Sequence, residues 1–297
     1  MTIASFKRAM CATAISSSLL LTGCVIHVSA DQFAEQKQQD LRVSAANVSQ
    51  LRIDAEAGSL IIKGDSNATA ITVNANIYAA KGDETYTLTL EKHGDTAELI
   101  SKLNNGSVSF YRGSSPHIDL IVSVPAQLKL DIDDDSGDIV IRAMQNDINI
   151  DDDSGSIVIE GGRNIRLDDD SGDIHISNVS GNINIEDDSG SIIIDQGQGQ
   201  GRIDIEDDSG DIRIENSQGP ARIIDESGSI SVKTLGGALT IEDGSGDIDV
   251  RHIKGLVTIT DGSGSIYVND TLGLTIIEAG SGDLSIDNIN GPVKLNK

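Results

Sequence analysis

A Ser-Gly pair recurs at nearly constant spacing from residue 131 to the last residues of this sequence. Most consecutive pairs lie 18 residues apart, with one interval of 17 and one of 20. A fixed period of this length is typical of repeat proteins, in which each unit stacks on its neighbours. The repeat constrains the fold more than any other feature, and its glycines are Gly137, Gly155, Gly172, Gly190, Gly210, Gly228, Gly246, Gly264 and Gly282.

Each unit contains two short alternations of apolar and polar residues. Ile139-Val140-Ile141 follows the first Ser-Gly pair, and Ile148-Asn149-Ile150 comes nine residues later. This pattern indicates three-residue strands with two inward side chains, separated by six-residue turns. Strands this short cannot hold a sheet alone, so the coils have to stack. The sequence predicts an all-β fold, a parallel β-solenoid of the β-helix or β-roll type with about 18 residues per coil.

The residue after the repeated glycine alternates between Asp and Ser, as in Asp138, Ser156, Asp173 and Ser191. With one unit per coil, each aspartate lies beside a serine, and like charges are about 9.6 Å apart. With two units per coil, every aspartate would lie on another aspartate. The alternation favours one unit per coil. Duplication of a 36-residue pair of units would produce the same alternation, and it is compatible with one unit per coil.

Eight aspartates occupy one position of the repeat, three residues before the glycine. In stacked coils they form a ladder whose neighbours, about 4.8 Å apart, repel by about 0.9 kcal/mol in bulk water. Either water solvates this ladder or cations bridge it, and Ca²⁺ takes oxygen ligands of this kind. The known calcium-loop signatures are absent, which favours a solvated acidic edge. The candidate metal ligands are Asp134, Asp152, Asp169, Asp187, Asp207, Asp225, Asp243 and Asp261.

The N-terminal residues predict a bacterial lipoprotein. Lys7 and Arg8 precede a short apolar stretch, and Leu21-Thr22-Gly23-Cys24 matches the lipobox. We expect residues 1–23 to be the signal peptide and Cys24 to carry the lipid. Because Val25 follows the cysteine in place of Asp, the outer membrane is the expected destination within the cell envelope. Residues 24–48 are predicted to be a tether, 49–130 an N-terminal β region or cap, and 131–297 the acidic solenoid.

The chain is strongly acidic, with 47 Asp and Glu against 22 Lys and Arg and a net charge of −25. Such a surface repels phosphate backbones, so nucleic acid is excluded as a partner. It attracts cations or basic proteins and peptides, although acidic surfaces also serve solubility alone. Aromatic residues make up only 2% of the chain, which argues against a sugar-stacking groove.

Several segments resemble a bacterial family of adhesin-like domains of unknown function. They are Gly58-Ser59-Leu60-Ile61-Ile62, the run from Ile118 to Pro125, and the motif Ser136-Gly137-Asp138-Ile139, and the resemblance covers roughly residues 45–297. It implies a β-solenoid in the cell envelope and does not imply a proven activity. The chain departs from the family in its density of Asp before the Ser-Gly pair.

No nucleophile elbow, phosphate-binding loop or His-Glu-x-x-His motif occurs, so we expect no enzymatic activity and no cofactor. The predicted function is that of a lipid-anchored structural or interaction protein of the envelope. Two alternatives are a Ca²⁺-binding solenoid module and an envelope-stress sensor that binds cationic peptides. The expected partners are the membrane, through the N-terminal lipid, and another envelope macromolecule or a cationic peptide.

Overall fold

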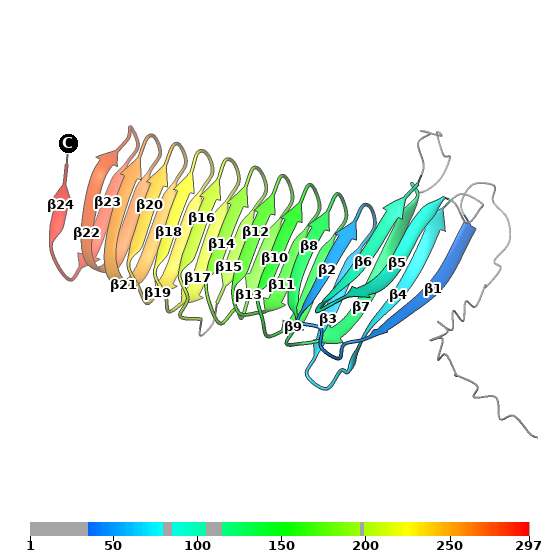
Figure 1. Ribbon diagram of the computed structural model, residues 1–297. Helices are drawn as coiled ribbons and strands as arrows, with labels where there is room; N and C mark the ends of the chain where they lie inside the picture. The colour runs from blue at the N-terminus through cyan, green and yellow to red at the C-terminus, as the bar shows by residue number, and fades with distance from the viewer. Residues whose placement is uncertain (1–34, 80–84, 105–114, 197–198, 297) are drawn as a thin grey trace, which may run out of the picture.

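The computed structural model of the chain describes residues 35–79, 85–104, 115–196 and 199–296. Every regular element in these ranges is a β-strand. The same ranges contain no helix that is long and apolar enough to cross a bilayer. The strands stack side by side into an elongated rod (Figure 1), as the predicted β-solenoid requires.

Two stacks of parallel strands form the rod, and we call them face 1 and face 2. Each strand pairs in register with strands one coil away, so that Ile148 lies between Leu130 and Ile165. This pairing confirms the parallel β-solenoid and its coil of about 18 residues. Face 1 contains β8 (Lys129–Asp134), β10 (Ile148–Asp152), β12 (Ile165–Asp169), β14 (Ile183–Asp187), β16 (Ile203–Asp207), β18 (Ala221–Asp225) and β20 (Leu239–Asp243).

Face 2 consists of the strands that follow the Ser-Gly turns. The 20-residue interval of the repeat leaves the register unchanged, because Ile183 pairs with Ile203 and Ile192 with Ile212. Face 2 contains β9 (Ile139–Met144), β11 (Ile157–Gly161), β13 (Ile174–Ser177), β15 (Ile192–Asp195), β17 (Ile212–Ser217) and β19 (Ile230–Leu235). Beyond them, β21 (Ile248–Asp261) and β22 (Ile266–Ala279) run through both faces, followed by β23 (Leu284–Ile289) and β24 (Val293–Leu295).

The solenoid begins well before residue 131, where the sequence places its boundary. β2 (Gln50–Ala55) pairs in parallel with β8, and β3 (Leu60–Asp65) pairs in parallel with β9. On their other side, β2 and β3 pair in parallel with β6 (Thr96–Leu103) and β7 (His117–Pro125). The order of these coils along the rod therefore differs from their order in the chain, and the N-terminal β region continues both faces.

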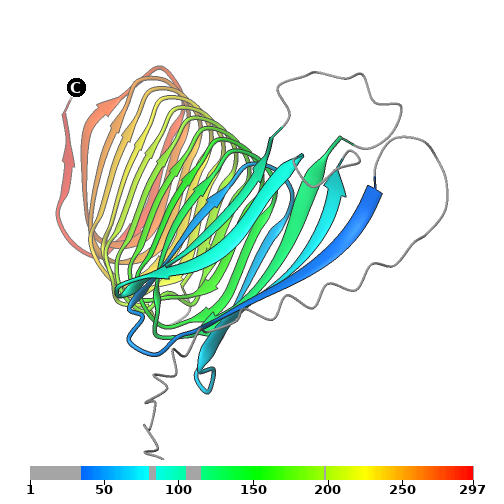
Figure 2. The same ribbon diagram turned by 45° about the vertical axis from the view of Figure 1, so that its right-hand side comes forward.

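Antiparallel strands close the N-terminal end of the rod (Figure 2). β4 (Ala70–Ala79) pairs with β7 and with β1 (Glu35–Ser44), and β5 (Tyr86–His93) pairs with β6. The expectation of a tether over residues 24–48 is therefore wrong for β1. The polar residues of β1 fit an edge strand, in which alternate side chains face water and the ladder on one side stays unpaired.

Aliphatic side chains fill the space between the two faces. In β10, Ile148 and Ile150 are buried while Asn149 between them is exposed. β-Branched side chains suit this position because they pack well on a pleated surface. Each buried residue lies on its equivalents in the neighbouring coils, so the core continues along the rod.

The Ser-Gly turns hold the coils at close range. Gly155 has a φ of 139°, and a Cβ at this position would lie 1.9 Å from the carbonyl oxygen of Gly137. The Gly155 N–H donates to the carbonyl oxygen of Ser171 in the next coil, at 3.0 Å. The close backbone approach thus explains why the turn repeats with glycine.

Candidate functional site

The eight aspartates of the repeat form a ladder in register, as the sequence predicts, but the ladder lies inside the rod. Their side chains are only 0–6% exposed. The expected solvated edge is therefore wrong for these residues. The reason is strand length: β10 has five residues, so its alternation buries Asp152 after Ile148 and Ile150. The buried ladder consists of Asp134, Asp152, Asp169, Asp187, Asp207, Asp225, Asp243 and Asp261.

The ladder carboxylates are poorly supplied with hydrogen-bond donors. In Asp187, Asp207, Asp225 and Asp243, Oδ1 accepts the N–H of the serine two residues later, at 3.1–3.3 Å. The Oδ2 atoms of these four residues are buried without a partner. Both carboxylate oxygens of the other four, Asp134, Asp152, Asp169 and Asp261, are buried without a hydrogen-bond partner.

Burial raises the pKa of every ladder aspartate, and neighbouring carboxylates raise it further in most of them. The pKa of Asp134 rises to about 8, with Asp152 as the strongest acidic neighbour. The pKa rises to about 7 in four residues and to about 6 in two, and it is raised in Asp261 as well. The four are Asp152, Asp169, Asp187 and Asp225, and the two are Asp207 and Asp243.

The structure gives the ladder no metal-ligand geometry. The aspartates stand in single file, one per coil, and do not surround a common point. Among the described residues, no three His, Cys, Asp or Glu side chains are placed to hold a metal ion. Ca²⁺ takes six to eight oxygen ligands, which a single file of aspartates does not by itself supply. Calcium binding therefore stays a prediction.

A second set of carboxylates points outward from face 1. These residues lie one position before the ladder, and their side chains face water in five successive coils. Asp54 of β2 extends the same column by one coil, because it pairs in register with Asp133. We call this set the acidic column: Asp54, Asp133, Asp151, Asp168, Glu186 and Glu206.

Only the ends of the acidic column are partly neutralised by basic residues. Lys102 pairs with Asp54 at 2.8 Å, Arg166 with Glu186 at 3.7 Å and Arg222 with Glu206 at 3.3 Å. Within the described ranges, no ion pair is formed by the three aspartates in the middle of the column. The result is a flat negative strip whose charges are about 4.8 Å apart.

The alternating Asp and Ser after the repeated glycine connect the coils in pairs. The Ser229 N–H donates to Asp211 Oδ1 at 3.0 Å, and the Ser265 N–H donates to Asp247 Oδ1 at 2.9 Å. Ser156 and Ser191 make the same bond to Asp138 and Asp173. Each aspartate thus lies beside a serine one coil away, which confirms the predicted stacking.

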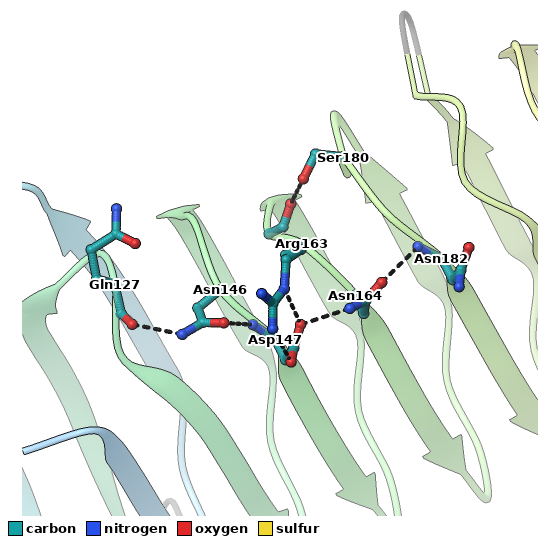
Figure 3. A network of polar contacts seen from close by, with 8 residues as sticks. Gln127, Asn146, Asp147, Arg163, Asn164, Ser180 and Asn182 are labelled. Atoms are coloured by element: carbon teal, nitrogen blue, oxygen red, sulfur yellow. Dashed lines mark hydrogen bonds and ion pairs between the residues drawn. The ribbon is translucent and has the colours of Figure 1, made fainter.

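On the opposite edge of the rod, asparagines and one ion pair connect the turns (Figure 3). Arg163 donates to both carboxylate oxygens of Asp147, at 2.7 and 2.6 Å, and lowers the pKa of Asp147 to about 2. Asn164 also donates to Asp147, and its Oδ1 accepts the N–H of Asn182 at 3.0 Å. These bonds satisfy the polar groups of the edge and stabilise the coil stacking.

A shallow depression of about 310 Å³ lies beside this network on face 1. Its polar side chains bond to one another, because Gln50 and Asn149 both donate to the carboxylate of Asp131. Lys129 and Arg166 are among the other residues that line it. Mutually satisfied groups leave little to direct a small ligand, so the acidic column is the stronger candidate surface.

The match to a family model decides the family. The Toastrack DUF4097 model matches residues 26–234, from before β1 to within β19. The chain belongs to the Toastrack DUF4097 family. The matched part of this Toastrack protein contains the acidic column and six of the eight ladder aspartates. The predicted lipidation site, Cys24, precedes the matched segment and lies outside the described residues.

Several solved structures resemble the Toastrack chain at low identity. A candidate adhesin from Parabacteroides distasonis is 14% identical with a TM-score of 0.33, covering 88% of this chain and 97% of the other. A candidate lipid-binding protein from the same organism is 15% identical, with the same TM-score and coverage. A candidate cell adhesion protein from Clostridium sporogenes is 12% identical with a TM-score of 0.29, covering 85% and 99%. No curated protein matches the chain in sequence.

Proposed function

We propose that this Toastrack protein is a lipid-anchored interaction scaffold of the bacterial cell envelope and has no catalytic activity. In this proposal Cys24 carries the lipid and anchors the rod at the outer membrane. The observation that carries the proposal is the acidic column, which repeats one carboxylate per coil on a flat, continuously paired face. Such a face distributes its contacts over many coils, as an adhesin-like scaffold requires.

The chemistry of the acidic column favours a basic macromolecular partner. Neighbouring carboxylates lie about 4.8 Å apart, within the screening length of about 8 Å in physiological salt, so their fields add up. A cationic segment that follows the column would relieve this repulsion along its length. A basic region of another envelope macromolecule fits this description, and so does a free cationic peptide, the ligand of the predicted stress sensor.

Binding of a fluorescent oligolysine peptide tests the acidic column. The full chain with Cys24→Ala avoids acylation and serves as the reference. A column variant that neutralises three carboxylates should raise the dissociation constant about tenfold at low salt, since each exposed pair contributes about 0.5 kcal/mol. The column variant combines Asp151→Asn, Asp168→Asn and Glu186→Gln.

A matched control removes the same charge from face 2, and it should change the dissociation constant by no more than about twofold. If both variants weakened peptide binding equally, binding would depend only on the net charge of the protein. The acidic column would then not be the binding surface. The absence of binding at low salt would refute a basic partner altogether. The control combines Glu160→Gln, Asp195→Asn and Glu215→Gln.

Membrane fractionation tests the anchor separately. The wild-type chain should sediment with membranes, and Cys24→Ala or treatment with globomycin should release it or leave it unprocessed. Unchanged fractionation of a Cys24→Ala chain that is processed to the same size as wild type would show that the lipid is not the anchor. This result would leave the peptide experiment valid, because that experiment does not depend on acylation.

A further inference from the structure

Within the part of the chain that the structure describes, the carboxylates of the buried ladder have no visible counter-charge. Each of its side chains is at least 94% buried, and at least one oxygen of every ladder carboxylate has no hydrogen-bond partner. Burying an ionised carboxylate without a partner is costly, so such groups are either paired with a cation or protonated. The ladder must therefore bind something that removes its charge.

Among the described residues, no basic side chain forms an ion pair with a ladder aspartate. The charged groups that most strongly affect the pKa values of the ladder are acidic, and they lie on the same strand, in the Ser-Gly turn or beyond it. The nearby Lys102 pairs instead with Asp54 at the surface. Besides the ladder residues themselves, these acidic groups are Asp133, Asp135, Asp138, Asp151, Asp153, Asp168, Asp170, Asp188, Asp208, Asp211, Asp247 and Glu278.

A buried serine provides an independent sign that the same inward position is built for polar groups. Ser101 of β6 pairs in register with Ala55, which pairs with Asp134, so Ser101 continues the line of the ladder. Ser101 is 2% exposed, and its Oγ has no hydrogen-bond partner. The small side chain of Ala55 separates Ser101 from Asp134, and both polar side chains point into the same interior line.

Protons suit this line better than metal ions. Single-file carboxylates offer at most two neighbours to an ion, whereas a carboxylic acid needs only one acceptor. When the Oδ2 of one aspartate carries a proton, it can donate to a carboxylate oxygen of the next aspartate along the rod. Sharing of this kind uses one proton for every pair of aspartates, so four to eight protons would satisfy the ladder.

We propose that the buried ladder is a proton-binding element, in which aspartates of neighbouring coils share protons and thereby fasten the coils at the Ser-Gly edge. Loss of these protons places uncompensated charges inside the rod and loosens that edge. The serine N–H groups that bond to Oδ1 remain in place in either state, so they position the carboxylates without neutralising them.

The direction of the pH dependence follows from the pKa values. The folded state raises the pKa of the ladder aspartates from 3.8 to about 6–8, so their contribution to stability is complete below about pH 4. This contribution is lost as the pH rises through 6 to 8. Ordinary carboxylates are ionised by pH 5.5, so they add little between pH 5.5 and 8.5. Comparing variants at the same pH cancels the contribution of every group outside the ladder.

Thermal melts of the Cys24→Ala chain at pH 5.5 and 8.5, with Asp187→Asn and Asp188→Asn introduced separately, test the proposal. The reference chain should melt at least about 5 °C higher at pH 5.5. Asp187→Asn should raise the melting temperature at pH 8.5 and reduce the difference between the two pH values. Asp188→Asn changes an exposed neighbour that acts on Asp187 only weakly, so both effects should be much smaller.

Three outcomes of the thermal melts would overturn the proposal. They are a melting temperature that does not fall between pH 5.5 and 8.5, a lower melting temperature of Asp187→Asn at pH 8.5, and a chelator that destabilises the reference chain. The last outcome would show that cations and not protons neutralise the ladder. Carbon NMR of the aspartate carboxyl groups gives a direct measure. Several resonances should titrate between pH 6 and 8, and completion of all titrations below pH 5.5 would also refute the proposal.

Discussion

At the scale of single residues, the repeated glycine has a steric cause. A Cβ at Gly210 would lie 1.6 Å from the carbonyl oxygen of Gly190, and the φ of Gly210 is 151°. Both the space and the backbone conformation therefore exclude other residues. The N–H of Gly210 also donates to the carbonyl oxygen of Ser227 in the next coil. The side chain is absent so that the backbones of successive coils can approach.

Gly210→Ala is expected to destabilise the rod by about 3 kcal/mol or more, since it adds a backbone clash to an unfavourable φ. Gly94→Ala is the matched control. Gly94 has a φ of 67°, but a Cβ there would have no heavy atom within 4 Å. Only conformational strain applies, so about 1 kcal/mol is expected. Urea unfolding followed by circular dichroism measures both, and equal losses would contradict the steric explanation.

At the scale of elements, the strand and turn patterns determine how much of this fold could be predicted. The 18-residue period and the Ile-x-Ile alternation were sufficient for the parallel solenoid, because both are local and repeated. The position of the ladder was mispredicted because the strands of face 1 continue for two residues beyond Ile-x-Ile. The five-residue alternation Ile148, Ile150, Asp152 was visible, but burial of an aspartate runs against its usual preference for water.

The N-terminal elements show what the sequence could not specify. β6 and β7 stack beside β2 and β3, although β4 and β5 separate them in the chain. No local pattern encodes this order, since it depends on which exposed edge pairs with which strand. The acidic column has no constant residue type in the sequence, because its position in the repeat changes from Asp to Glu and then to Ile224.

The Asp-Ser pairs at the Ser-Gly turn predict a measurable coupling between coils. Asp211→Ala removes the acceptor of the Ser229 N–H, and the expected loss of stability is about 1 kcal/mol. Asp211→Asn retains an oxygen acceptor and should restore most of that loss. If the two variants were equally unstable, the hydrogen bond would not be the cause. Urea unfolding at pH 7 provides the comparison.

At the scale of the whole molecule, negative charge is concentrated in one part of the rod. Residues 131–221 contain 24 acidic and 5 basic residues, a net charge of −19. Residues 222–297 contain 11 acidic and 6 basic residues, a net charge of −5. All of the acidic column except Asp54 and most of the ladder belong to the first part. Repulsion between carboxylates is therefore strongest in the N-terminal half of the repeat, which also contains most of the proposed binding surface.

Repulsion of this size predicts that salt stabilises the protein. Raising NaCl from 50 to 500 mM shortens the screening length below the spacing of neighbouring strands, so the melting temperature at pH 7.5 should rise by several degrees. The column variant with three neutralised carboxylates should show a smaller rise. An unchanged melting temperature in wild-type protein would mean that the folded rod does not concentrate charge more than the unfolded chain.

Calcium chloride at matched ionic strength separates screening from specific binding. If only screening acts, Ca²⁺ and Na⁺ should raise the melting temperature by similar amounts, because screening depends on ionic strength. A clearly larger effect of Ca²⁺, lost on adding chelator, would revive the calcium hypothesis. Asp169→Asn then identifies the location, since a site in the ladder would lose the calcium effect while Asp168→Asn on the outer face would keep it. Loss of the effect in Asp168→Asn alone would place the ion on the acidic column.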